Sequence, residues 1–209
     1  MNQFTPYFKE HFYKKLLTPA GSNPVRNRAD SFLKIFEILD AMPKDYYRII
    51  ETGTMRPDHG NLCFGDDGCS TYIFNDFIEI MGGSFTSVDI NPANSSHALM
   101  MLAPSSRANI IISDSVEHLW KIPADVKFDL IYLDSYDIVR SNPHPSQLHH
   151  IKELCAVIKN TQPGTIICVD DHDAFFTGGQ IGKGNYVKSF MKNINAKLIY
   201  EGYQIVWQL

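Results

Sequence analysis

The sequence lacks a long hydrophobic run. None of its apolar stretches approaches the roughly 20 residues that a membrane-spanning helix needs. Its first residues, MNQFTPYFKEHFYKKLL, also lack the continuous apolar core of a signal peptide. We therefore expect no membrane partner and a cytoplasmic location.

The sequence also lacks an excess of positive charge. It has 19 lysine and arginine residues and 23 aspartate and glutamate residues, which gives a formal net charge of −4. Proteins that bind nucleic acid by neutralising its phosphates usually carry a basic excess. Nucleic acid is therefore not favoured as a partner.

Cysteine is scarce, with 4 residues in a chain of 209. A chain of this length buries enough surface to fold without support from disulfides or a metal. Cys155 and Cys168 lie within apolar patterns, so we expect both to be small buried side chains in a reducing compartment. A zinc site formed by His59, Cys63 and Cys69 is the alternative use of cysteine, but the His-x3-Cys-x5-Cys spacing matches no usual zinc motif.

The character of the sequence changes near residue 46. Residues 1–45 are amphipathic and rich in aromatic side chains, and we expect them to be helical. Within them, Asp30 is the expected cap of a helix formed by the run SFLKIFEILDAM. This segment is a candidate lid over a substrate or the arm of a homodimer. Residues 46–209 are expected to form the main domain.

Short apolar runs alternate with helical patterns in this main domain. Strands that are buried on both faces have such runs, and their alternation with helices indicates right-handed β-α-β units and a parallel sheet. The last residues, AKLIYEGYQIVWQL, are typical of two strands around a Glu201-Gly202 turn and predict an antiparallel hairpin. The expected fold class is therefore α/β. The predicted parallel strands lie at 46–53, 84–90, 108–115, 128–135 and 164–171.

Every one of these parallel strands ends in an acidic residue. Because the carboxyl ends of parallel strands lie at one edge of a sheet, where ligands bind in open α/β folds, we expect the acids to line that edge. Aspartate is also common in turns and at helix caps, which is the alternative explanation at any single position. The acids are Glu51, Asp89, Asp114, Asp134 and the pair Asp170 and Asp171.

The first three acids favour a particular kind of ligand. Glu51 opens the turn E-T-G-T, in which Gly53 lets the backbone approach a ligand closely. The glycine patterns of dinucleotide and phosphate loops are absent from this turn, where a carboxylate would also repel a pyrophosphate. Asp89 can accept both hydroxyls of a ribose, and Asp114 with Ser115 can contact a purine edge. S-adenosylmethionine (SAM), a nucleoside with a cationic, amine-bearing tail, matches all three.

Four motifs resemble, in the same order, those of the class I SAM-dependent methyltransferases. They are E-x-G-T at Glu51, V-D-I-N-P at 88–92, D-S-x-E-x-L at 114–119 and L-D-S at 133–135. The resemblance covers the main domain and implies a Rossmann-like fold, with a mostly parallel seven-stranded sheet that ends in an antiparallel hairpin. With the acids above, the expected SAM-binding residues are Glu51, Gly53, Thr54, Arg56, Ser70, Asp89, Ile90, Asp114 and Ser115.

One departure from the family pattern follows the first turn. In O-methyltransferases this turn continues as E-x-G-T-x-x-G-x-S, whereas here residues 55–67 intervene before G-C-S-T at 68–71. The match implies that Ser70 lies near the SAM carboxylate. The inserted segment is a candidate cover for cofactor or substrate, with Arg56 either meeting the methionine carboxylate or remaining exposed.

The last three acids predict a metal site. Asp134, Asp170 and Asp171 end two neighbouring strands, and unpaired carboxylates so close together need a cation or raised pKa values. Oxygen ligands of this kind suit Mg²⁺. The arrangement resembles that of metal-dependent O-methyltransferases of the catechol and macrocin types, which implies that these acids hold a divalent ion and, through it, a pair of substrate oxygens. Helix capping is the alternative, and we favour a simple loop position over a ligand role for His172.

The resemblance implies that the methyl acceptor is a hydroxyl of a small molecule, activated by a metal held at Asp134. In the catechol type a lysine three residues after the fourth-strand acid is the general base, but Asp137 stands at that position here. His144, between two prolines, is the candidate replacement. Arg26 and Arg28 either bind an anionic group of the substrate or lie solvated at the surface.

Two other functions are compatible with the same residues. The Glu-x-Gly turn and the Asp-Asp pair also resemble proteins described as cephalosporin hydroxylase-like. A non-catalytic partner protein that binds SAM without transferring its methyl group is the other alternative, although such a protein would be expected to lose some of these acids. Methylation of DNA or RNA is not favoured, because no N-P-P-Y tetrapeptide follows the fourth strand.

Overall fold

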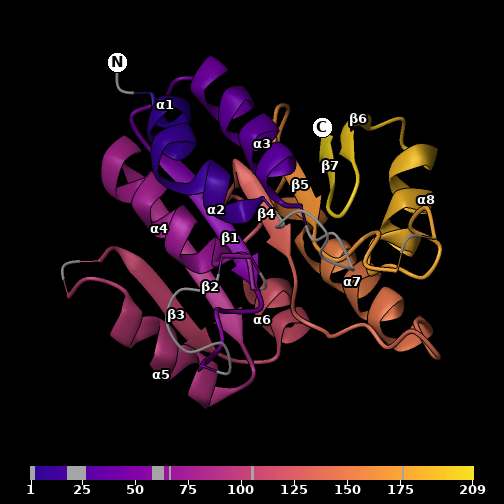
Figure 1. Ribbon diagram of the computed structural model, residues 1–209. Coiled ribbons are helices and arrows are strands. Elements are labelled where there is room, and N and C mark those ends of the chain that lie inside the picture. Colours follow the sequence, from indigo (N-terminus) through magenta and orange to yellow (C-terminus); the bar gives the residue numbers. More distant parts are fainter. Residues whose placement is uncertain (1–2, 18–26, 58–63, 66, 105, 176) are drawn as a thin grey trace.

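The described part of the chain contains one seven-stranded sheet with the strand order β3-β2-β1-β4-β5-β7-β6 (Figure 1). The computed structural model describes residues 3–17, 27–57, 64–65, 67–104, 106–175 and 177–209. All neighbouring strands are parallel except β7, which runs antiparallel to both β5 and β6. The strands are β1 (Tyr47–Thr52), β2 (Gly83–Asp89), β3 (Ala108–Ile112), β4 (Leu130–Leu133), β5 (Ile166–Val169), β6 (Lys197–Glu201) and β7 (Ile205–Gln208).

The predicted α/β fold is confirmed, including the terminal hairpin of β6 and β7. The two central strands show why the apolar runs predict it: LIYL in β4 and IICV in β5 are buried at every position. The helical elements in the described residues are α1 (Phe4–Phe8), η1 (Lys9–Tyr13), α2 (Lys14–Leu16), α3 (Ala29–Ala41), α4 (Ser70–Met81), α5 (Pro92–Met101), α6 (Ser115–Lys121), α7 (His144–Val157), η3 (Ile158–Asn160) and α8 (Asn185–Asn193).

Helices cover both faces of the sheet (Figure 1). One face packs against α1, α3 and α4, and alternate strand residues such as Ile49 and Tyr132 point into this layer. The other face packs against α6, α7 and α8, and it receives the intervening residues, such as Ile50 and Ile131. Two hydrophobic layers therefore cover the central strands β4 and β5, which have no solvent-facing side, whereas the edge strands β3 and β6 have exposed positions.

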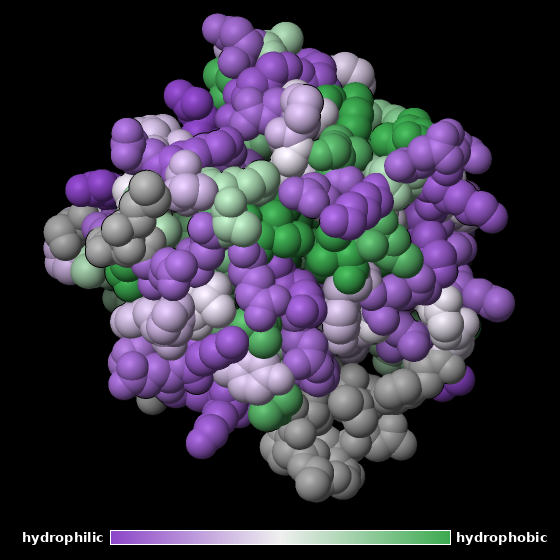
Figure 2. Space-filling view, turned by 90° about the horizontal axis from the view of Figure 1, so that it is seen from above, coloured by the Kyte–Doolittle hydropathy of each residue, from purple (hydrophilic) through white to green (hydrophobic). Residues whose placement is uncertain are grey.

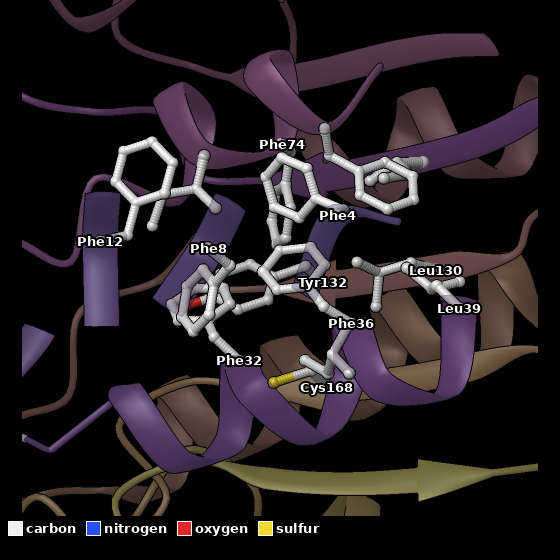
Figure 3. Close-up of a cluster of buried hydrophobic side chains, with 14 of the residues drawn as sticks. Phe4, Phe8, Phe12, Phe32, Phe36, Leu39, Phe74, Leu130, Tyr132 and Cys168 are labelled. Atoms are coloured by element: carbon white, nitrogen blue, oxygen red, sulfur yellow. The ribbon is translucent and has the colours of Figure 1, made fainter. Parts of the chain in front are cut away.

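The N-terminal helices belong to the first of these layers. Figure 3 shows Phe8, Phe32 and Phe36 gathered near Tyr132 of β4, together with Phe74 of α4. The rings of Phe32 and Tyr132 are stacked with centroids 5.8 Å apart. The described part of residues 1–45 therefore shares the hydrophobic core of the main domain.

Two local predictions are wrong. Asp30 does not cap α3, because the helix begins two residues earlier than expected, at Ala29, and its N-cap is Arg28. Asp30 lies in the first turn instead and accepts a hydrogen bond from the hydroxyl of Tyr13 at 2.6 Å. Cys155 is exposed rather than buried, since it lies on the outer side of α7, whereas Cys168 of β5 is buried as expected.

The surface is largely polar where it can be seen from above. Figure 2 shows hydrophilic side chains over most of this face and a patch of hydrophobic ones near its centre. Among the described residues, no helix combines the length and the apolar character that crossing a membrane requires.

Candidate active site

A cavity of about 270 Å³ opens at the carboxyl ends of β1 and β4. The strand order reverses between these two strands, which is where open α/β sheets usually bind ligands. The cavity brings together many of the predicted residues. Those that line it are Gly53, Thr54, Arg56, Ser70, Asp89, Ile90, Asp134 and Asp137. We call this the first cavity.

A second cavity, of about 210 Å³, continues from the first. The two share Asp89, Ile90 and Ser135, so together they form one elongated crevice. Asp114 and Ser115, both predicted, line the second cavity at the start of α6. The crevice therefore runs along the ends of β1, β2, β3 and β4.

The second cavity is also lined by two side chains that were not among the predicted site residues. Tyr136 and His149 lie on its wall, with their ring centroids 5.3 Å apart. His149 forms a hydrogen bond with the hydroxyl of Ser115 at 3.0 Å. Its neighbour His150 is fully buried, and burial lowers its pKa to about 4.

Gly53 forms the floor of the first cavity. Its φ of +81° lies in the left-handed region that favours glycine. A Cβ atom at this position would lie only 2.5 Å from the carbonyl oxygen of Asp134. The glycine thus allows the turn after β1 to pass directly against the end of β4.

Asp89 is held in a fixed orientation at the end of β2. Its Oδ2 accepts hydrogen bonds from the backbone N–H of Thr54 and from the side chain of Asn94, both at 3.0 Å. Its Oδ1 accepts one from the backbone N–H of Asn91 at 2.7 Å. Asp89 also lines both cavities, so the held residue lies where they meet.

Glu51 does not face the crevice, which corrects the prediction that it contacts a ligand. Side chains of β1 alternate, so Glu51 points to the same face as Ile49, into the layer beneath α4, and is completely buried. Its Oε2 accepts hydrogen bonds from Thr71 at 2.7 Å and from Ser87 at 2.6 Å, and Oε1 accepts one from Ser70. Glu51 therefore connects the start of α4 to β1 and β2.

Burial raises the pKa of Glu51 from 4.5 to about 7, against the opposing effect of its three hydroxyl donors. The native state thus binds this proton more tightly than the unfolded chain does. The resulting stability is complete below pH 4.5 and is lost as the pH rises to about 7, a loss of about 3 kcal/mol. We expect Glu51→Gln to remove this pH dependence, measured by urea unfolding at pH 5 and pH 8.

The exposed Glu10→Gln variant is the matched control for this substitution, because the side chain of Glu10 is 77% exposed. It should keep the pH dependence of the unmodified protein. Equal pH slopes for Glu51→Gln and Glu10→Gln would contradict the assignment.

Arg56 and Asp137 pair with each other across the mouth of the first cavity. Two guanidinium nitrogens of Arg56 donate to the two carboxylate oxygens of Asp137, at 2.8 and 3.1 Å. Asp67 lies 4.0 Å from the same guanidinium group. Arg56 is therefore available at the cavity wall, but its charge is already partnered by acids.

Asp134, Asp170 and Asp171 lie close together as predicted, and we call them the acidic cluster. Two buried cations occupy this cluster. Lys183 Nζ donates to Oδ1 of Asp134 and lies 3.1 Å from Oδ2 of Asp171. Arg28 donates through Nε to both oxygens of Asp170, at 2.9 and 3.1 Å. Each carboxylate of the cluster is thus paired with a positive charge.

The charges of the cluster determine which of its acids is easiest to protonate. Burial alone would raise the pKa of Asp171, but Lys183 and Arg28 hold it below its usual value. Burial raises the pKa of Asp134 well above its usual value, against the opposing charge of Lys183. Since three carboxylates face two cations, a single proton neutralises the cluster, and Asp134 is the member that lines the first cavity.

The arrangement does not fit the predicted metal site. The oxygens that were expected to face a divalent ion instead accept hydrogen bonds from Lys183, Arg28 and the side chain of Gln204. In the described residues, no three His, Cys, Asp or Glu side chains are disposed to hold a metal ion. The prediction that Asp134, Asp170 and Asp171 ligate Mg²⁺ therefore finds no support in this geometry.

Other predicted residues lie elsewhere. His144 begins α7, lines neither the first nor the second cavity, and shares a hydrogen bond of 2.7 Å with the hydroxyl of Tyr186. His172 is a buried loop residue 3.5 Å from Glu201, in agreement with the favoured interpretation. The proposed zinc ligands His59 and Cys63 lie outside the described residues, and so does Arg26.

Arg28 and Lys183 are the main residues of the site that the prediction missed or misplaced. Arg28 was expected to bind substrate or lie solvated, but it is buried and its guanidinium group lies 4.7 Å from the ring centroid of Tyr203. Lys183 carried one signal in the sequence, since it is the lysine of the glycine-rich segment 178–184 that follows the Asp-Asp pair.

Comparison with known proteins identifies the fold. No protein-family model matches the sequence, and no curated protein matches it. MycE, a methyltransferase of the mycinamycin pathway solved with Mg, SAH and mycinamycin VI, matches with a TM-score of 0.62 and 15% identity, over 99% of this chain and 54% of MycE. A putative O-methyltransferase from Klebsiella pneumoniae matches with a TM-score of 0.53 and 16% identity, over 100% of this chain and 90% of that protein.

CalS11, a calicheamicin methyltransferase, matches with a TM-score of 0.55 and 13% identity, over 85% of this chain and 77% of CalS11. The chain has the Rossmann-like fold of class I SAM-dependent methyltransferases, with the seven-stranded, mostly parallel sheet and the terminal hairpin expected from the sequence. It spans about half the length of MycE.

Proposed function

We propose that this protein is a SAM-dependent methyltransferase that acts on a hydroxyl of a small molecule. The observation that carries the proposal is that one crevice is lined both by Asp89, an acceptor for ribose hydroxyls, and by Asp134, an acceptor for a proton. The methyltransferase fold supports it, as do the complexes of MycE with SAH and with a small-molecule substrate.

The residues of the crevice suit the parts of SAM. Asp89 would accept the ribose hydroxyls, and Ile90, Asp114 and Ser115 of the second cavity would surround the adenine. The turn at Gly53 would let the methionine part approach the backbone. Arg56 would meet the methionine carboxylate by exchanging its present partner Asp137 for it.

Asp134 would be the general base. SAM supplies an electrophilic methyl group when it is bound. An acceptor hydroxyl in the first cavity would donate its proton to Asp134, whose pKa is raised by burial and thus nearer to that of a useful base. The surrounding turns would orient the hydroxyl and exclude water, which accounts for much of the rate of such transfers. Asp137 and His144 have no role in this scheme.

Metal dependence is not part of the proposal. MycE was solved with Mg, but the carboxylates of this chain that correspond to the predicted metal ligands are paired with Arg28 and Lys183. The proposed proton transfer to Asp134 therefore involves no divalent ion.

Calorimetric titration with SAM tests the proposal. We expect the unmodified protein to bind SAM, and we expect Asp89→Asn to bind it about 10- to 100-fold more weakly because hydrogen bonds to a charged acceptor are lost. Asp125→Asn, which alters an exposed aspartate of the turn before β4, should bind as tightly as the unmodified protein. Failure of the unmodified protein to bind SAM would refute the proposal.

Transfer of a labelled methyl group from SAM to a set of hydroxyl-bearing small molecules tests the reaction itself. Incorporation that is lost on replacing Asp134 by Asn would support the assignment of the base. Binding of SAM with no transfer to any acceptor would instead favour the non-catalytic binding protein.

A further inference from the structure

The glycine-rich segment 178–184 is explained by close packing around His172. A Cβ atom at Gly179 would collide with the imidazole ring of His172, and one at Gly182 would collide with its carbonyl group. A Cβ atom at Gly184 would lie 2.7 Å from Nδ1 of the same ring. Since side chains have no room at these positions, the loop needs glycine there and is held against His172.

This loop fixes the position of Lys183. The backbone N–H of Lys183 donates to the carbonyl oxygen of Asp171 at 3.1 Å, so the lysine starts beside the acidic cluster. Its side chain is completely buried and ends between Asp134 and Asp171. A lysine is rarely buried to this extent unless acids pair with its charge.

Arg28, which lies near the other end of the sequence, is the second buried cation of the acidic cluster. Its Nη2 lies 2.9 Å from Oδ2 of Asp170 and 3.7 Å from Oδ1 of Asp171, and the side chain is 4% exposed. The side-chain amide of Gln204 donates to Oδ1 of Asp170 at 3.0 Å. Both oxygens of Asp170 are therefore paired. Oδ1 of Asp171 accepts a hydrogen bond from the hydroxyl of Tyr203, so Asp134 and Oδ2 of Asp171 are left to meet a further cation.

A divalent ion would compete with Lys183 for the same position. Asp134 and Asp171 direct their oxygens at Nζ, and Mg²⁺ requires such oxygens at about 2.0–2.1 Å from its centre. The ion and the ammonium group cannot occupy this space together. We propose that Lys183 is the resident cation of the acidic cluster and takes the place of a divalent ion in positioning Asp134.

If the proposed function holds, the presence of Lys183 in place of a divalent ion has a consequence for the methyl acceptor. A divalent ion would hold a pair of acceptor oxygens, such as a vicinal diol. Lys183 does not line the first cavity, so it acts through Asp134, whose carboxylate can accept a hydrogen bond from one hydroxyl. The acceptor therefore does not need a chelating pair of oxygens, since one hydroxyl beside Asp134 is sufficient.

Binding of Mn²⁺, followed by calorimetry and electron paramagnetic resonance, tests the inference in the absence of SAM and acceptor. We expect the unmodified protein to show no saturable Mn²⁺ binding with a dissociation constant of about 1 mM or lower, the range of protein sites for divalent ions. Lys183→Ala removes the ammonium group and opens space beside two carboxylates, so it should bind Mn²⁺ at least about tenfold more tightly. A purely structural lysine would give no such gain.

Two matched variants control the experiment. Lys183→Arg keeps a positive charge and should not gain affinity, and Lys188→Ala removes a lysine that pairs with Glu201 on the surface and should not gain it either. Saturable binding by the unmodified protein that Asp171→Asn abolishes would overturn the inference, and so would a folded Lys183→Ala with no gain. If Lys183→Ala does not fold, the titration of the unmodified protein decides alone.

The result is independent of methyl transfer. A protein that binds SAM but also binds Mn²⁺ in the acidic cluster would retain the proposed function and lose this inference. A protein that binds neither would retain the inference about the cluster and lose the proposed function.

Discussion

Replacing Gly53 by alanine is expected to abolish SAM binding. The new Cβ atom would lie 2.5 Å from the backbone carbonyl oxygen of Asp134 and 2.8 Å from its carbonyl carbon. Neither atom belongs to a flexible side chain, so the turn after β1 and the end of β4 must separate. Calorimetry should show at least a 100-fold loss of affinity, of order 3 kcal/mol, because the floor of the cavity is displaced. Urea unfolding should show a loss of stability of about 1–3 kcal/mol from the positive φ.

Gly65→Ala is the control for this substitution. Among the described residues, a Cβ atom at Gly65 would have no heavy atom within 4 Å, so both SAM affinity and stability should change little. If Gly53→Ala and Gly65→Ala bound SAM equally well, the first cavity would not be the SAM site. A loss of stability without a loss of SAM affinity would have the same consequence.

The fold could be predicted because its signals are local. The strands β4 and β5 are apolar at every position, and each is too short to be a buried helix of ordinary length. The orientation of Glu51 was less predictable than the strand that carries it. Because successive side chains of a strand alternate, Glu51 of β1 shares the face of Ile49 and is buried in that layer rather than exposed at the sheet edge.

The candidate site was predictable only in part, for a related reason. Acids at strand ends can be placed from the order of the strands, and Asp89 and Asp134 indeed line the first cavity. Their cations cannot be placed in this way. Arg28 is 142 residues from Asp170, and Lys183 is 49 residues from Asp134. No spacing rule connects such residues, so a cluster of acids without visible partners suggested a metal.

Replacing Phe8 by alanine is expected to destabilise the whole fold. Phe8 of α1 is completely buried, and its ring lies 5.0 Å from that of Phe36 and 6.3 Å from that of Phe32. Both partners belong to α3, which packs on the sheet beside Tyr132 (Figure 3). Removing a buried phenyl ring leaves a cavity that costs about 3–5 kcal/mol. Urea unfolding should show this loss in a single transition, followed by fluorescence and by circular dichroism.

Tyr46→Ala provides the comparison, because the ring of Tyr46 is 52% exposed and packs mainly against Arg48. Its cost should be within about 0.5 kcal/mol, as for most surface substitutions. The form of the Phe8→Ala transition distinguishes a shared core from a separate arm. An arm would melt in an early transition of its own and leave the stability of the sheet unchanged. A shared core loses α1 and the sheet together, since the aromatic layer beneath α3 is the contact that joins them.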